Sequence, residues 1–157
     1  MSLFRFITRL ASVFYKPQLS ACKTQSWSHP PPVSTMVKKI VVEGYEAFTE
    51  CLKENTGTVF VLFSGSLDDT GVSWCPDCVK ADPVIERNVD KAPEDSVFVH
   101  CHVGPRDYWK DQSNEFRKDP QLYLKCVPTL LRVGKPHRLE EEQCCSDDLV
   151  QMMFEED

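Results

Sequence analysis

The feature that most constrains this 157-residue chain is a Cys-x-x-Cys pair, Cys75 and Cys78, which lies where a strand pattern gives way to a helix pattern. Two cysteines so spaced on a first helical turn are able to close a small disulfide. The helix N-terminus also offers partial positive charge and free N–H groups, which favour a thiolate. The motif therefore predicts thiol–disulfide chemistry, with Cys75 as the exposed nucleophile and Cys78 as the resolving thiol.

The pattern around the motif predicts an α/β domain. A continuous apolar run at 59–63, between turn signals, is typical of a strand buried on both faces at the centre of a parallel or mixed sheet. After Cys78, apolar residues recur at helical spacing, so Cys78 is expected to face inward; they are Ala81, Ile85 and Val89. Further strands are expected at 37–42, 97–103 and 128–131, and further helices at 45–52, 113–118 and from 146. Such an alternation builds a sheet flanked by helices.

Charge divides the chain into two parts. Residues 1–35 contain four basic residues and no acidic one, and since the whole chain carries −6, the remainder carries −10. We expect 1–35 to be a basic leader, either disordered or a targeting segment that resembles a mitochondrial presequence, and 36–157 to form the domain. The acidity of the domain disfavours nucleic acid and anionic membrane as partners. No apolar run approaches membrane-spanning length.

The cysteines favour a redox site over a metal site. Only one pair among the eight cysteines has motif spacing, which suits a reducing compartment. The alternative is half of a zinc site, with further ligands from His100, Cys101 and His102. These three residues lie on a predicted strand, however, where alternate side chains face opposite ways, and Cys101 is expected to be a buried apolar residue. We therefore expect no bound metal.

Three residues around the cysteines have predicted supporting roles. Trp74 is expected to pack beside the nucleophile, and Pro76 fixes the backbone at the helix start, where its missing N–H costs nothing. Asp77 places a carboxylate near Cys75 and opposes thiolate formation, whereas the helix N-terminus favours it. One hypothesis is that Asp77 narrows the substrate range by repelling acidic partners. The alternative is an acid that only suits a helix start.

Several stretches of the chain carry a resemblance to a known family: 73–78, 103–104, 108–111, 116–118 and 127–131. In these residues the chain resembles the thioredoxin superfamily and, within it, the family of thioredoxin domain-containing protein 17. The resemblance implies a thioredoxin fold, with a central mixed sheet flanked by helices, and protein-disulfide reductase activity in the cytoplasm. It implies that no cofactor is bound and that electrons arrive from NADPH through thioredoxin reductase. Protein disulfides, small disulfides such as cystine, and peroxide are the implied substrates.

The same resemblance implies further features of the site. The Val127–Pro128 bond should be cis and face the dithiol, so that the Val127 backbone pairs with an extended substrate strand. Thioredoxins also carry a buried Asp in the central strand, which accepts the proton of the resolving thiol. The corresponding run here, 61–63, is apolar. Proton transfer at Cys78 is therefore expected to use water or another group such as Asp77.

Alternatives stay open for the function, the compartment and the other thiols. The second function is a redox-sensing adaptor with a thioredoxin fold, which binds signalling partners without turnover. The second compartment is the mitochondrion, if 1–35 acts as a presequence. Cys126 is expected near the rim of the site, either forming an intermolecular disulfide under oxidation or buried as a small apolar residue. Cys144 and Cys145 are expected to be loop thiols, because a disulfide between adjacent cysteines is strained.

Overall fold

The computed structural model of the protein describes residues 36–155, so the expected leader at 1–35 lies outside the described residues. The described chain forms the following elements in order: β1 (Lys38–Glu43), α1 (Tyr45–Glu54), β2 (Val59–Ser64), α2 (Pro76–Asn88), the 3-10 turn η1 (Val89–Lys91), β3 (Val97–His102), α3 (Arg106–Lys110), α4 (Glu115–Lys118), β4 (Thr129–Arg132), β5 (Arg138–Glu140), the 3-10 turn η2 (Glu141–Cys145) and α5 (Asp147–Glu155). No helix in this range is long and apolar enough to cross a membrane.

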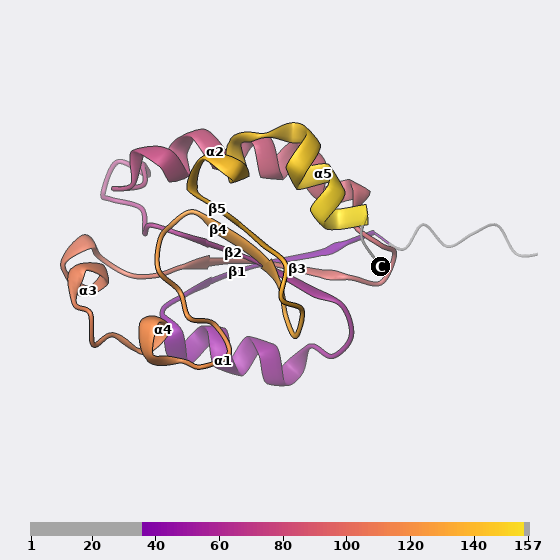
Figure 1. The fold of residues 1–157 in the computed structure, drawn as a ribbon. Coiled ribbons are helices and arrows are strands. Elements are labelled where there is room, and N and C mark those ends of the chain that lie inside the picture. The colour runs from indigo at the N-terminus through magenta and orange to yellow at the C-terminus, as the bar shows by residue number, and fades with distance from the viewer. Residues whose placement is uncertain (1–35, 156–157) are drawn as a thin grey trace, which may run out of the picture. The chain divides into compact units, whose positions relative to one another are not determined.

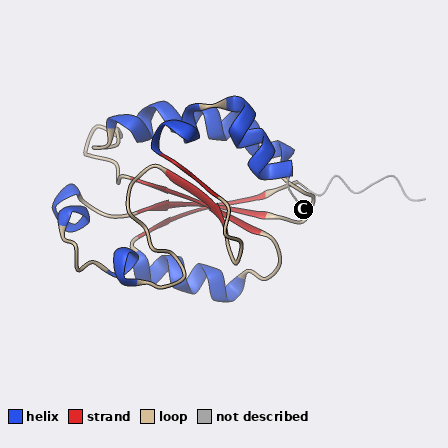
Figure 2. Cartoon of the chain, in the orientation of Figure 1, coloured by secondary structure: helices blue, strands red, loops and turns tan. Residues whose placement is uncertain are grey.

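The strands form one mixed sheet in the order β1-β3-β2-β4-β5. β1 and β2 both run parallel to β3, whereas β4 runs antiparallel to β2 and to β5. Helices α2 and α5 cover one face, and α1 and α4 lie on the other (Figures 1 and 2). The prediction of a mixed sheet flanked by helices is confirmed, as is the central place of the apolar strand.

Strand β2 joins the two halves of the core because its alternate side chains point to opposite faces. All six of its residues are buried. Phe60 packs edge-on against Phe154 of α5 at 5.1 Å between ring centroids, and Phe63 packs against Phe48 of α1 at the same distance. A strand buried on both faces thus fixes the helical layers relative to one another.

The loop between β2 and α2 is folded by its own side chains. Asp68 Oδ1 accepts hydrogen bonds from the backbone N–H groups of Thr70 at 2.8 Å and Val72 at 3.2 Å. Leu67 and Ser73 then pair as an isolated antiparallel bridge. This closed loop delivers the chain to the first turn of α2 in a defined position.

Two parts of the C-terminal half differ from the expectation. Helix α3 was not indicated by the sequence, because five residues are too few to establish a helical period. Cys144 is fully buried in η2, where its thiol lies 3.3 Å from the carbonyl of Leu139, so its interpretation as a loop thiol is wrong. A 3-10 turn that packs onto the core buries one side chain in each turn, and here Cys144 takes that place.

Candidate active site

The two motif cysteines lie together at the N-terminus of α2. Cys75 is the N-cap residue, and its sulfur accepts a hydrogen bond from the backbone N–H of Cys78 at 3.3 Å. Both are free thiols, and the Cys78 thiol donates to Cys75 with 2.6 Å between the sulfur atoms. Cys78 is fully buried, which confirms that it faces inward.

The expectation that Cys75 is exposed is wrong, because only 5% of its surface is open. The cover comes from a distant part of the chain. The Cys75 thiol lies 3.5 Å from the carbonyl oxygen of Val127, to which it donates, and Val127 is itself only 8% exposed. Cys75 and Val127, which are 52 residues apart in the sequence, thus cover one another at the site.

The surroundings of the two sulfur atoms separate their acidities. The pKa of the Cys75 thiol is lowered to about 7, first by the hydrogen bond from the Cys78 thiol and then by the N–H groups of Cys78 and Asp77. Burial and the Asp77 carboxylate oppose this lowering of the Cys75 pKa. The pKa of Cys78 is raised far above its usual range by its hydrogen bond to Cys75 and by burial. Cys75 is thus the thiol that ionises near neutral pH, and Cys78 keeps its proton.

Asp77 faces solvent and does not serve the buried thiol. Its carboxylate is exposed and forms an ion pair with Lys80 at 3.0 Å, on the outer side of α2. Cys78, by contrast, has no exposed surface. Of the acceptors expected for the Cys78 proton, water or another group such as Asp77, Asp77 is therefore not placed to take it, because the first turn of the helix directs the two side chains apart.

Replacing Asp77 by asparagine is expected to lower the pKa of Cys75, since the carboxylate raises it. The pKa of Cys75 should fall by less than about 1, because the Asp77 carboxylate is largely solvated. The rate of iodoacetamide reaction at Cys75, followed by peptide mass spectrometry against pH, measures it. Asp90→Asn, which removes an exposed charge in η1, the turn directly after α2, is the control. A midpoint that stays or rises in Asp77→Asn contradicts the prediction.

Trp74, Ser73 and Gly65 pack closely next to the dithiol. The indole N–H of Trp74 donates to the carbonyl of Gly104 at 3.0 Å. The Ser73 hydroxyl donates to the carbonyl of Gly65 at 2.8 Å and accepts the N–H of Cys75 at 3.3 Å. A β-carbon at Gly65 would lie 2.8 Å from the Trp74 ring. Glycine is therefore required at this position by close packing.

The Val127–Pro128 peptide bond is cis, as the resemblance implies. It precedes β4 and places the Val127 carbonyl against the Cys75 sulfur. Cys126, one residue earlier, is half-buried, and burial raises the pKa of its thiol. Its part in an intermolecular disulfide stays a prediction.

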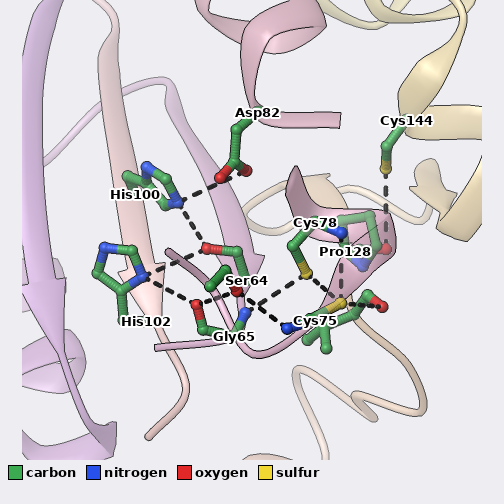
Figure 3. A network of polar contacts seen from close by, with 11 residues as sticks. Ser64, Gly65, Cys75, Cys78, Asp82, His100, His102, Pro128 and Cys144 are labelled. Atoms are coloured by element: carbon green, nitrogen blue, oxygen red, sulfur yellow. Dashed lines mark hydrogen bonds and ion pairs between the residues drawn. The ribbon is translucent and has the colours of Figure 1, made fainter. Parts of the chain in front are cut away.

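A polar network beneath the dithiol was not found by sequence reasoning (Figure 3). Ser64, the last residue of β2, has its hydroxyl 2.6 Å from Nε2 of His100 and 3.4 Å from Nδ1 of His102. The two imidazole rings lie 4.5 Å apart, and His102 Nδ1 is also 3.4 Å from the Gly65 carbonyl. The backbone N–H of Gly65 donates to the Cys78 sulfur at 3.4 Å, so the network extends to the resolving thiol.

Asp82 lies next to His100, at the end of this network. Its Oδ1 is buried, lies 3.9 Å from Nε2 of His100 and has no hydrogen-bond partner among the described residues. Burial raises the pKa of Asp82 to about 6 and lowers the pKa of His100 to about 4. Near neutral pH an ionised carboxylate therefore faces a neutral imidazole, and the two do not form an ion pair.

Among residues 36–155, neither a cluster of metal ligands nor the pocket of about 950 Å³ includes the dithiol. Within residues 36–155, no three His, Cys, Asp or Glu side chains gather as metal ligands, so this range offers no ligand set for the zinc alternative. A pocket of about 950 Å³ lies between α1 and the β4–β5 turn, but neither cysteine of the motif lines it. The reactive geometry consists of the dithiol, its cover and the network beneath it.

Sequence comparisons agree with this geometry. Residues 41–156 match a family model described as thioredoxin domain-containing protein 17-like, thioredoxin domain. Thioredoxin domain-containing protein 17 of Danio rerio is 50% identical over 121 residues, and that of Homo sapiens is 44% identical; each match covers 76% of this chain and 97% of the relative. The thioredoxin-like protein Clot of Arabidopsis thaliana is 40% identical over 74 residues, which is 46% of this chain and 55% of the relative.

A solved structure, of the reduced Schistosoma mansoni thioredoxin pre-protein, is similar with a TM-score of 0.47 at 14% identity, over 74% of this chain and 95% of that one. The assignment rests on the sequence matches, which cover most of the chain. They identify the mixed sheet and its helices as a thioredoxin fold. The chain belongs to the family of thioredoxin domain-containing protein 17.

Proposed function

We propose that this protein is a protein-disulfide reductase that uses Cys75 and Cys78 to reduce disulfides of proteins and of small molecules such as cystine. The observation that carries the proposal is the difference between two adjacent thiols. The pKa of Cys75 is lowered to about 7, whereas that of Cys78 is raised and its sulfur is fully buried. Cys75 is thus able to attack as a thiolate, while Cys78 stays protonated until the second step.

The proposed reaction has two exchange steps. The Cys75 thiolate attacks one sulfur of the substrate disulfide and forms a mixed disulfide with it. The substrate S–S bond breaks, and the other substrate sulfur leaves as a thiolate that takes a proton from water. Cys78 then loses its proton and attacks the Cys75 sulfur, which breaks the mixed disulfide and releases the second substrate thiolate. The substrate gains two electrons and the dithiol loses two, ending as a Cys75–Cys78 disulfide.

The return to the dithiol needs a reductant. We propose NADPH through thioredoxin reductase, with no cofactor bound to the protein itself, and we extend the substrate class to peroxide. The proposed compartment is the cytoplasm, with the mitochondrion as the alternative if 1–35 acts as a presequence. These parts of the proposal derive from membership of the family, and the chemistry of a free dithiol is compatible with them.

Exposed apolar side chains flank the dithiol and suit a protein substrate. Leu67 and Val72 of the loop before α2 are 52% and 49% exposed, and Val79, directly after Cys78, is 44% exposed. Apolar surface around a reactive sulfur favours contact with the unfolded or extended segments in which accessible disulfides occur. This surface supports protein disulfides as one substrate class.

The test is NADPH consumption by the full-length protein with thioredoxin reductase, with cystine and then insulin as substrates. Cys75→Ser is expected to reduce turnover to the background rate, because no other described thiol combines a lowered pKa with a resolving partner. Cys126→Ser, which removes a half-buried thiol near the same loop, is the matched control and should keep the parent rate. Equal rates for the parent and Cys75→Ser would refute the reductase.

The second candidate is a redox-sensing adaptor, and the burial of Cys75 favours it. A cysteine residue that is only 5% exposed is less accessible to bulky disulfides than to small oxidants. A protein that shows no turnover, yet oxidises and recovers its dithiol reversibly, would fit this function.

A further inference from the structure

The buried thiol of Cys78 needs a proton acceptor, and the Cys-x-x-Cys motif does not supply one. Its thiol keeps its proton, because its pKa is raised by the hydrogen bond to Cys75 and by burial. That proton has to leave before Cys78 attacks the mixed disulfide. Asp77 is paired with Lys80 in solvent, and the central strand beneath the site offers no acid at 61–63. Another acceptor is needed within reach of the buried sulfur.

Asp82 is the carboxylate whose position suits a proton acceptor for Cys78. It lies on α2 four residues after Cys78, and side chains at this spacing are neighbours on one face of a helix. Its charge acts on the Cys78 thiol. Its buried Oδ1 has no hydrogen-bond partner among the described residues, so this oxygen is free to accept a proton. Burying an unpaired carboxylate is unfavourable, and protonation relieves the cost.

We propose that Asp82 accepts the proton of Cys78 when the mixed disulfide is resolved, and that His100 and Ser64 position its carboxyl group (Figure 3). This inference rests on the proposed function, since it concerns the second exchange step of that reaction. The acceptor lies on the helix that carries the dithiol; His100 lies within β3, and Ser64 is the last residue of β2.

The step is balanced in protons and electrons. The Cys78 proton passes to the Asp82 carboxylate, directly or through one bridging water, and gives a neutral carboxylic acid. The sulfur attacks Cys75, the mixed disulfide breaks, and the second substrate thiolate leaves. Asp82 then returns its proton to solvent through a pocket of about 250 Å³, which it lines together with His100 and Glu86.

His100 and Ser64 are positioning residues in this scheme. The Ser64 hydroxyl holds Nε2 of His100 at 2.6 Å, and the imidazole in turn stands 3.9 Å from Asp82 Oδ1. A neutral His100 stands beside the buried Oδ1 without neutralising the carboxyl group, whose side chain is 30% exposed. Ser64 also contacts His102, whose ring stacks at 4.5 Å against that of His100.

The charged groups around Asp82 come from three elements. From β3, His100 and His102 face it; from α2, Cys78 and Glu86 do. Glu86 raises the pKa of Asp82, whereas His102 lowers it, and burial has the largest effect. From β1, Lys39 forms an ion pair with Glu86 at 3.0 Å and so moderates the repulsion.

The test resolves the two exchange steps by rapid mixing of the full-length protein with dithiobis-nitrobenzoate. Reaction at Cys75 releases one coloured thiolate, and attack by Cys78 releases a second; the phase that disappears in Cys78→Ser is the resolving step. In the parent, the rate of this phase should rise with pH through about 6, the pKa of Asp82, and level off above it. The assay needs no reductase, so it reports on Asp82 even if the proposed turnover with NADPH fails.

Asp82→Asn is expected to slow the resolving phase on the order of 100-fold near neutral pH, which is the usual contribution of a general base. Its rate should then climb about tenfold per pH unit without a plateau, because solvent has to remove the proton. The Cys75 phase should stay within about threefold. Asp82→Glu should restore part of the plateau, and His100→Gln should slow the phase several-fold and shift its midpoint. An unchanged midpoint in His100→Gln removes the positioning role.

Asp82 as a proton acceptor and Asp82 as a nearby charge predict opposite changes in the rate of the resolving phase of Asp82→Asn. If Asp82 acts only as a nearby negative charge, Asp82→Asn makes Cys78 easier to ionise, and the resolving phase becomes faster. An equal or faster phase therefore overturns the proposal. Asp90→Asn, the control for loss of an exposed carboxylate, should leave both phases unchanged.

Folding of the Asp82→Asn variant is checked by thermal unfolding. The pKa of Asp82 in the folded protein, about 6, lies above its unfolded value, so protonation favours the folded state. This contribution is present at low pH and is lost as pH rises through about 6. At pH 8 the variant should therefore melt at or above the temperature of the parent, and a lost resolving phase would then not result from unfolding.

Discussion

Replacing Phe116 by alanine is expected to lower the free energy of unfolding by about 3–5 kcal/mol, the usual cost of truncating a buried aromatic side chain. Phe116 is fully buried, and its ring lies 5.3 Å from that of Tyr45 and 5.7 Å from that of Phe63. Helix α4 has only four residues and is too short to be stable without this anchor. Urea unfolding followed by circular dichroism measures the loss.

The control for Phe116→Ala is Met152→Ala, which truncates a side chain that is 55% exposed on α5. Such a change should stay within about 0.5 kcal/mol of the parent. A loss below about 1 kcal/mol in Phe116→Ala would mean that the cluster of Phe116 with Tyr45, Phe48 and Phe63 collapses around the cavity.

Gly65→Ala is expected to have the largest effect on activity outside the two cysteines. The added methyl group would lie 2.8 Å from the Trp74 ring, 2.9 Å from the Ser73 hydroxyl and 3.0 Å from the β-carbon of Cys75. At least one of these groups has to move; the Ser73 hydroxyl accepts the N–H of Cys75, and the β-carbon carries the Cys75 sulfur itself. Overpacking of this kind costs about 1–3 kcal/mol. A displacement of about 1 Å lowers the reaction rate on the order of 100-fold.

Gly57→Ala provides the matched control. Gly57 has a φ of +104°, so alanine there is strained by the backbone, but nothing lies within 4 Å of the new β-carbon. Both variants should therefore lose stability, and only Gly65→Ala should slow the reaction of Cys75 with a substrate disulfide. Parent-like rates in Gly65→Ala, measured under conditions where it is fully folded, would show that the site absorbs the methyl group.

The local parts of the site could be predicted from the sequence. The spacing of Cys78 with Ala81, Ile85 and Val89 predicted that Cys78 faces inward, since the period of the helix is fixed. The apolar run of β2 likewise indicated the sheet centre, because only a strand covered on both faces excludes polar residues throughout. These features depend on neighbours in the chain.

The features of the site that the sequence did not predict are contacts between residues far apart in the chain. The cover on Cys75 comes from Val127, which is 52 residues later. Ser64 meets His102 because β2 and β3 pair in parallel register, and this register is not visible in either strand alone. One signal was present: His100 and His102 alternate on a strand whose other residues are buried. Polar side chains that are half-buried in such a strand need hydrogen-bond partners for their covered atoms.

The strand pairing also affects how the chain is assembled. β1 and β2 both pair in parallel with β3, so each connection has to cross a helical layer, and among the described strands only β4 and β5 are joined by a tight turn. Most of the sheet therefore waits for β3 to leave the ribosome, and closing such long loops is slow. Until β3 completes the sheet, Cys51, which is buried in the folded protein, is open to oxidation. Completion of the sheet thus protects this thiol during synthesis.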